Sequence, residues 1–239
     1  MSVSAKAFTA WRQLAAPGES TADLCRLAGI KRSTLAQQLV RGKVSESTVV
    51  RVARACDLEP VQALSYFEEY SGLAAGVRPP LDAELISQVN YVSILKVLVA
   101  RSEGEDRMPE LSAYPHPYSV RAWFDAVDPG DLRQRLAAAT GVAPQNLSAQ
   151  LQAGRLSPEL AVAAGRLAGV SLASGLVVTG VLTPDEAGWP LQGREQALFR
   201  LSASELVLLA RDRLEVLGKA LRKMEHDENR KQTLLENLG

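Results

Sequence analysis

Hydrophobic residues in the first quarter of the chain recur three or four positions apart, in short runs that glycine and polar residues separate. Such spacing puts apolar side chains on one face of a helix and predicts short amphipathic helices. The three runs are Leu24 and Leu27, then Leu35 and Leu39, then Val49, Val52 and Ala53.

Polar and glycine residues mark where these helices begin and end. Thr21 and Ser45 stand at expected N-caps, Ser33-Thr34 opens the second helix, and Gly29 and Gly42 follow the first two helices. A helix, a tight glycine turn and a second helix form the helix-turn-helix arrangement.

The same pattern occurs again further along the chain. Aligning residues 10–64 with residues 122–176 without a gap makes 14 of 55 positions identical. In a chain so rich in Ala and Leu, roughly a third of that number is expected by chance. The identities include the structural positions Gly29 and Gly141, Leu35 and Leu147, and Gly42 and Gly154. The sequence therefore predicts an internal duplication, with copy one near residues 10–64 and copy two near residues 122–176.

Each copy is followed by an amphipathic segment, beginning near Glu84 in the first half and near Glu205 in the second. Aromatic residues make up only 5% of the chain, and its abundant Ala and Leu favour helix. We expect an all-α fold with two tandem helix-turn-helix domains, each followed by an amphipathic helix, and a long C-terminal helix. The expected division is a helix-turn-helix domain at 1–78, an amphipathic connecting helix at 79–102, a linker at 103–118, a second and diverged domain at 119–199, and the C-terminal helix at 200–239.

The C-terminal segment has apolar residues at alternating intervals of three and four. They are Val207, Ala210, Leu214, Leu217, Leu221 and Met224. This is a heptad seam of about three repeats, which Glu228 and Lys231 then interrupt. Two interpretations remain open. The helix either forms a homodimer, with Leu214, Leu217, Leu221 and Met224 at its interface, or packs on its own domain.

Composition limits the class of protein. Charged residues are 23% of the 239 residues, hydrophobic residues 46%, and the formal net charge is zero, which is typical of a globular protein. The chain opens without a charged-then-apolar leader and has no apolar run of about 18 residues. We therefore expect a cytoplasmic protein with no membrane partner, whose Cys25 and Cys56 are reduced small hydrophobic residues.

Residues for metal binding or catalysis do not form a recognisable pattern. Cys25 and Cys56 together with His116 and His226 match no zinc-ligand spacing. No nucleophile, base and carboxylate recur together, and no phosphate-binding loop is present. We expect no cofactor, no metal site and no enzymatic activity.

Leu24, Gly29, Leu35 and Gly42 together resemble the lambda-repressor-like (XRE-type) helix-turn-helix domain of phage repressors and bacterial regulators. The resemblance covers roughly residues 8–73 and, more faintly, 120–182. It implies that Arg32–Val40 is a recognition helix that enters the DNA major groove, and that the protein is a transcriptional repressor such as a phage immunity repressor. Thr21 stands where many members have a glutamine that contacts a phosphate, and the interval from Gly29 to Gly42 is one residue longer than usual.

Helical geometry of about 100° per residue identifies the outer face of Arg32–Val40. With Leu35 and Leu39 facing inward, Ser33, Gln37 and Arg41 point outward, and Thr34 and Val40 lie beside them. Glutamine pairs with adenine and arginine with guanine, while cations at the helix ends suit phosphates. Between Lys31 and Arg54, six basic residues against Glu46 give a local charge of +5. The expected DNA-binding residues are Thr21, Lys31, Arg32, Ser33, Thr34, Gln37, Arg41 and Lys43.

Copy two has lost most of this charge. Between Ala143 and Arg166, two arginines against Glu159 leave +1. Its candidate DNA-binding residues are Gln145, Asn146, Gln150 and Arg155. Copy two is either a former DNA-binding domain retained for packing or assembly, or a weaker second reader that copy one anchors by raising its effective concentration.

We therefore predict a sequence-specific regulator that binds double-stranded DNA as its operator. One alternative is a protein-interaction module, such as an antitoxin or assembly factor, built on the same scaffold. Another is a non-specific nucleoid-type binder, whose affinity would fall uniformly as salt rises.

Overall fold

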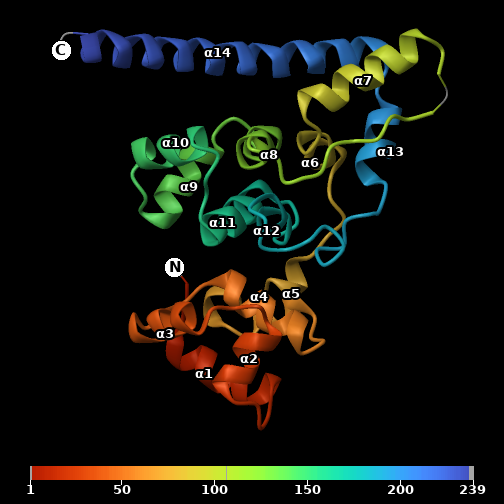
Figure 1. Cartoon of the computed structure of the whole chain (residues 1–239). Helices are drawn as coiled ribbons and strands as arrows, with labels where there is room; N and C mark the ends of the chain where they lie inside the picture. Colours follow the sequence, from red (N-terminus) through yellow and green to blue (C-terminus); the bar gives the residue numbers. More distant parts are fainter. Residues whose placement is uncertain (1, 106, 237–239) are drawn as a thin grey trace. The chain divides into compact units, whose positions relative to one another are not determined.

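The computed structural model describes residues 2–105 and 107–236, and it confirms that the fold is all-α. A pair of two-residue strands adds a minor antiparallel contact, in which Val3 faces Val44 and Ser4 faces Lys43. Figure 1 shows the chain. The elements of the first half are β1 (Val3–Ser4), α1 (Ala5–Ala15), α2 (Thr21–Leu27), α3 (Arg32–Val40), β2 (Lys43–Val44), α4 (Glu46–Ala55), α5 (Pro60–Ser65), the 3-10 helices η1 (Glu68–Tyr70) and η2 (Ala74–Gly76), α6 (Asp82–Ser87) and α7 (Tyr91–Ser102). Those of the second half are α8 (Ser119–Val127), α9 (Leu132–Thr140), α10 (Pro144–Gln152), α11 (Pro158–Ala168), α12 (Ser174–Val178), α13 (Gly193–Arg200) and α14 (Ala203–Glu236).

Helix positions repeat along the whole chain. Helix α3 begins at Arg32 and α10 at Pro144, and α7 begins at Tyr91 and α14 at Ala203, so that the start residues of each pair differ by 112. Even the caps correspond. The Asn90 side chain accepts from the Ser93 N–H before α7, and the Ser202 hydroxyl accepts from the Glu205 N–H before α14. The counterpart of α14 is therefore α7, whereas the sequence suggested the segment near Glu84, which lies in α6.

The chain forms two compact units, each built from two separated segments. Unit 1 contains residues 1–88 and 114–193, and unit 2 contains residues 89–113 and 194–239. This division corrects two expectations. Residues 79–102 form two helices, α6 and α7, because the Asn90 cap starts a new helix. The expected linker at 103–118 divides between the units, and its Leu111 is buried.

The core of copy one is an aromatic cluster beneath α1. The ring centroids of Phe8 and Trp11 lie 5.8 Å apart, and those of Trp11 and Phe67 lie 5.7 Å apart. Nearby, the buried Tyr70 hydroxyl donates to Glu46 Oε1 at 2.7 Å. Burial and the Glu46 carboxylate raise the pKa of Tyr70, so that it remains a neutral donor.

Copy two takes part of its core from the first half of the chain. Helix α6 packs on α8, and the fully buried Glu84 carboxylate accepts from Trp123 Nε1 at 3.0 Å and from the Leu81 N–H at 2.9 Å. The hydrogen bond to Glu84 matters because an unpaired buried indole N–H costs about 1–3 kcal/mol. Glu84 therefore belongs to the copy-two core, although it precedes copy two by more than 30 residues in the sequence.

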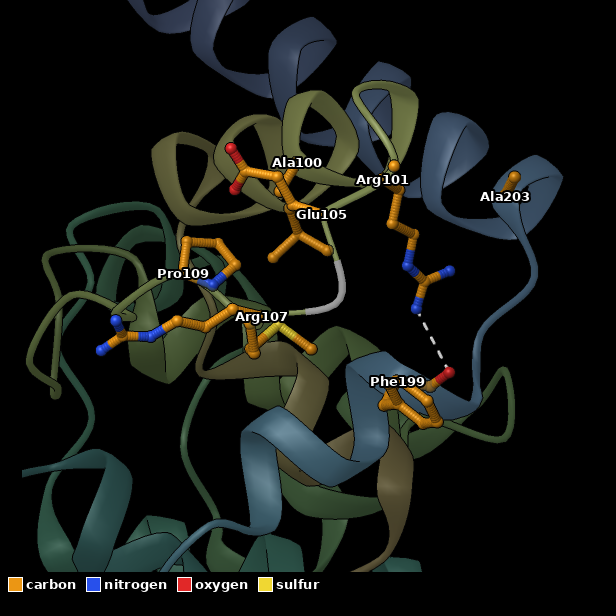
Figure 2. A pocket seen from close by; sticks show the side chains of 10 residues that line it. Ala100, Arg101, Glu105, Arg107, Pro109, Phe199 and Ala203 are labelled. Carbon is orange, nitrogen blue, oxygen red and sulfur yellow. Dashed lines mark hydrogen bonds between the residues drawn. The ribbon is translucent and has the colours of Figure 1, made fainter.

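Unit 2 is organised around α7 and α14. Figure 1 shows α7 alongside the first part of α14, with the two helices running in opposite directions. Ile94 of α7 and Leu206 of α14, equivalent positions of the repeat, are both fully buried. Arg101 holds the end of α13, because its guanidinium donates to the carbonyl oxygens of Leu198, Phe199 and Leu201 at 2.6–3.2 Å. Figure 2 shows the hydrogen bond to Phe199.

Contacts inside unit 1 also join copy one to copy two. The Leu172 N–H donates to the Gly76 carbonyl at 3.1 Å. Arg54 donates to both carboxylate oxygens of Glu186, at 2.6 and 2.7 Å. Burial alone would raise the pKa of Glu186, but the hydrogen bonds from Arg54 and Thr183 outweigh it and lower that pKa. The same hydrogen bond raises the pKa of Arg54.

Replacing Glu186 with Gln should weaken this contact in a pH-dependent way. A carboxylate whose pKa is lower in the folded state stabilises the fold above its ordinary value, and loses this effect as the pH falls through the folded pKa. At neutral pH we expect Glu186→Gln to lower the free energy of unfolding by about 0.5–1 kcal/mol. Below the ordinary glutamate value of 4.5, the difference should shrink. Urea unfolding of wild type and Glu186→Gln, from neutral pH to below 4.5, tests this prediction. The exposed Glu69→Gln is the control. A difference in unfolding free energy that does not change with pH would contradict the prediction.

Candidate nucleic-acid interface

Helix α3 spans Arg32–Val40, as predicted, and buries few of its side chains against the rest of copy one. Leu35 is its fully buried side chain, and Leu39 is half-buried. Gln38, which sequence reasoning left without a role, supplies a polar anchor. Its Oε1 accepts from the Ser45 N–H and from the Thr48 hydroxyl, both at 3.1 Å. This network connects α3 to the N-terminus of α4 and fixes which face of α3 points outward.

The turn before α3 has the expected glycine, but the N-cap residue of α2 is not the one that the sequence predicted. Gly29 has φ +63°, a left-handed conformation that favours glycine. Helix α2 is capped by Ser20, whose hydroxyl accepts from the Asp23 N–H at 3.2 Å. Thr21, expected as the cap, is instead the first helical residue, and its hydroxyl accepts from Arg12. Thr21 remains exposed at the N-terminus of α2.

The outer face of α3 is fully available to a ligand. Its exposed side chains include Arg32, Ser33, Thr34 and Gln37, and Arg41 at the C-cap is exposed as well. Val40 is 89% exposed, which suits contact with a thymine methyl group. Donors, acceptors and one apolar side chain thus lie on a single helix face.

A groove of about 330 Å³ lies between the N-termini of α3 and α4. Lys31 and Thr34 line one side of it, and Ser47 and Arg51 line the other. Backbone N–H groups at helix N-termini bind anions, and the two cations add to this. Sequence reasoning predicted Lys31 and Thr34 here and counted Arg51 in the basic patch, but it named neither Ser47 nor Arg51 as a DNA-binding residue. The i, i+4 spacing of these two on α4 was the signal that could have identified them.

The charge expected in this region needs one correction. Arg54 was counted in the basic patch, but it is bound by Glu186. When Arg54 is left out of the count, the formal charge of the segment that begins at Lys31 is +4 rather than +5. The remaining cations are exposed, and Lys43 presents its side chain from β2. They are Lys31, Arg32, Arg41, Lys43 and Arg51.

The equivalent face of copy two differs in its anchoring and in its chemistry. Leu147 and Leu151 of α10 are both buried. Gln145, Asn146 and Arg155 are exposed, whereas Gln150 is half-buried at the position equivalent to Gln38. Copy two thus offers two outward amides and little charge for phosphates.

Other candidate sites were also located. The predicted dimer residues lie on α14, with Leu214, Leu221 and Met224 exposed and Leu217 half-buried.

A pocket of about 410 Å³ in unit 2, drawn in Figure 2, lies beside Arg101, whose guanidinium is already bound to carbonyl groups.

In the part of the chain that the structure describes, His, Cys, Asp and Glu form no group of three or more that could hold a metal ion. None of its helices combines the length and the apolar character needed to cross a membrane.

Comparison with protein-family models, with curated proteins and with solved structures found no match.

Proposed function

We propose that this chain is a sequence-specific double-stranded DNA-binding regulator of transcription, with α2 and α3 as a helix-turn-helix and α3 as its recognition helix. The observation that carries the proposal is a coincidence on one surface. The exposed outer face of α3, with Ser33, Gln37 and Arg41, lies within the basic patch of a protein with zero net charge. A helix face that is merely solvated does not require a basic patch around it.

The groove between α3 and α4 supports the same proposal. A helix that lies in the DNA major groove has phosphates passing at its ends. On the protein, Lys31 and Arg51 line the groove between α3 and α4. Phosphate contacts would fix the position of α3, while Gln37 and Arg41 would read base edges. Action as a repressor, of the phage immunity type among others, follows from the resemblance of Leu24, Gly29, Leu35 and Gly42 to that family.

The residues of copy two fit an accessory role in DNA binding better than a role equal to that of copy one. Its α10 has two outward amides and little positive charge, and phosphate neutralisation supplies most sequence-independent affinity. In this proposal copy two is mainly structural. Weak reading by Gln145 and Asn146 would appear as a second half-site at fixed spacing from the first.

Selection of bound sequences from a random DNA pool tests the proposal, at about 150 mM salt where weak electrostatic binding is suppressed. We expect the wild type to enrich a motif, and Gln37→Ala to lose preference at one position by about 1–3 kcal/mol. The matched control is Gln62→Ala, an exposed glutamine on α5, which should leave the motif unchanged. If the wild type enriches no motif, the protein-interaction alternative replaces this one.

Phosphate contacts should be visible in the salt dependence. Lys43→Ala should weaken binding to all sequences alike and reduce the slope of log affinity against log salt by about one unit. Arg54→Ala should leave the slope unchanged, because Arg54 is bound by Glu186. Fluorescence anisotropy at several salt concentrations measures both slopes. An equal change for the two variants would contradict the assignment of Lys43 to phosphate.

A further inference from the structure

Much of the apolar seam on α14 is not covered by its own chain. Helix α7 packs on the first part of α14, where Leu206 and Ala210 are buried. Beyond this contact, Leu214 is 41% exposed, Leu221 is 47% exposed and Met224 is 67% exposed. Packing on the same chain therefore explains the beginning of the seam but leaves the part from Leu214 to Met224 without a role.

An apolar groove continues this seam along α7. It has a volume of about 560 Å³ and is lined by Leu98 of α7 together with Val207, Ala210 and Leu214 of α14. Arg211 and Glu215 form its polar rim. A second helix lying over Leu217 and Leu221 would extend into this groove without displacing α7.

We infer that the occupant is α14 of a second copy of this chain, paired in the antiparallel direction about a two-fold axis near residue 219. Facing residues then combine the two halves of the seam. Leu214 lies against Met224 of the second copy, and Leu217 lies against Leu221 of the second copy, with each contact occurring twice. Such an isologous interface closes at two chains, and it stands independently of the proposal that copy one binds DNA.

Charge distinguishes the antiparallel from the parallel arrangement. In the heptad, Arg211 and Glu225 both flank the seam at e positions, and antiparallel pairing brings Arg211 beside Glu225 of the second copy. Glu228 occupies a core position of the next repeat. In a parallel pair it would face Glu228 of the second copy, with like charges inside the seam, whereas antiparallel pairing puts the two Glu228 side chains at opposite ends of the seam.

Gly218 supplies an independent reason for the position of the axis. Glycine is disfavoured inside a helix, and a Cβ atom at Gly218 would meet nothing within 4 Å in the single chain. The packing of one chain thus gives no reason for a glycine there. In the antiparallel pair, Gly218 faces Gly218 of the second copy and Ala220 faces Ala220 of the second copy, so that small residues let the two backbones approach at the axis.

Cysteine cross-linking of the full chain tests the direction and the axis. In a Cys56→Ser background, with Cys25 buried, we expect Ala220→Cys to form covalent dimers under mild oxidation at least tenfold more than Lys219→Cys. The two positions are adjacent, but Lys219 lies on the outer side of the helix. Equal cross-linking at both positions would overturn the proposal.

Sedimentation without DNA tests the energetics. A seam of four layers is short, so we expect the wild type to dimerise with a dissociation constant on the order of micromolar. Arg211→Glu or Glu225→Arg alone should weaken the dimer about tenfold, because each converts two attractions to repulsions. The double variant should restore wild-type association. The proposal would be overturned by a wild type that stays monomeric at a protein concentration of about 100 micromolar. A double variant that dimerises no more tightly than the single variants would overturn it as well.

Discussion

The exposed face of α3 depends on the hydrogen bonds of Gln38. Because the helix buries only Leu35 completely, its rotation about its own axis is not fixed by a wide apolar stripe. The Gln38 side chain supplies the missing constraint by bonding Ser45 and Thr48 at the start of α4. This polar contact leaves most of the α3 surface open to a ligand. The buried face of α10, with two leucines, shows the alternative solution in copy two.

Local signals in the sequence predicted the local structure of the candidate interface well. The glycine turns and the Ser45 cap follow from spacing and from the preferences of single residues, and the bounds of α3 are those that the family resemblance implied. Thr21 was assigned as a cap because Ser20 and Thr21 are chemically similar, and only backbone geometry selects Ser20. Gln38 was missed because nothing in its own neighbourhood distinguishes a structural amide from a solvent-facing one.

Contacts between distant residues could not be predicted in this way. Arg54 looks like one more cation of the basic patch until Glu186, from the other half of the chain, is found beside it. Likewise, residues 79–102 have the hydrophobic pattern of one connecting helix, but α6 is needed by Trp123 and α7 by α14. Periodicity identifies an apolar face, whereas the element that covers this face is decided by the tertiary fold.

The interleaved arrangement of the two units has a consequence for the order of events during synthesis. Copy one is complete in the first part of the chain, but α7 lacks its main packing partner until α14 has been made. At ordinary ribosomal speeds, the 80 residues between residue 113 and residue 194 take on the order of ten seconds to synthesise. During this interval the apolar face of α7 is exposed on the nascent chain, and copy one can already be folded. A ribosome-bound chain thus acquires the α3 surface well before it acquires the α7–α14 pair.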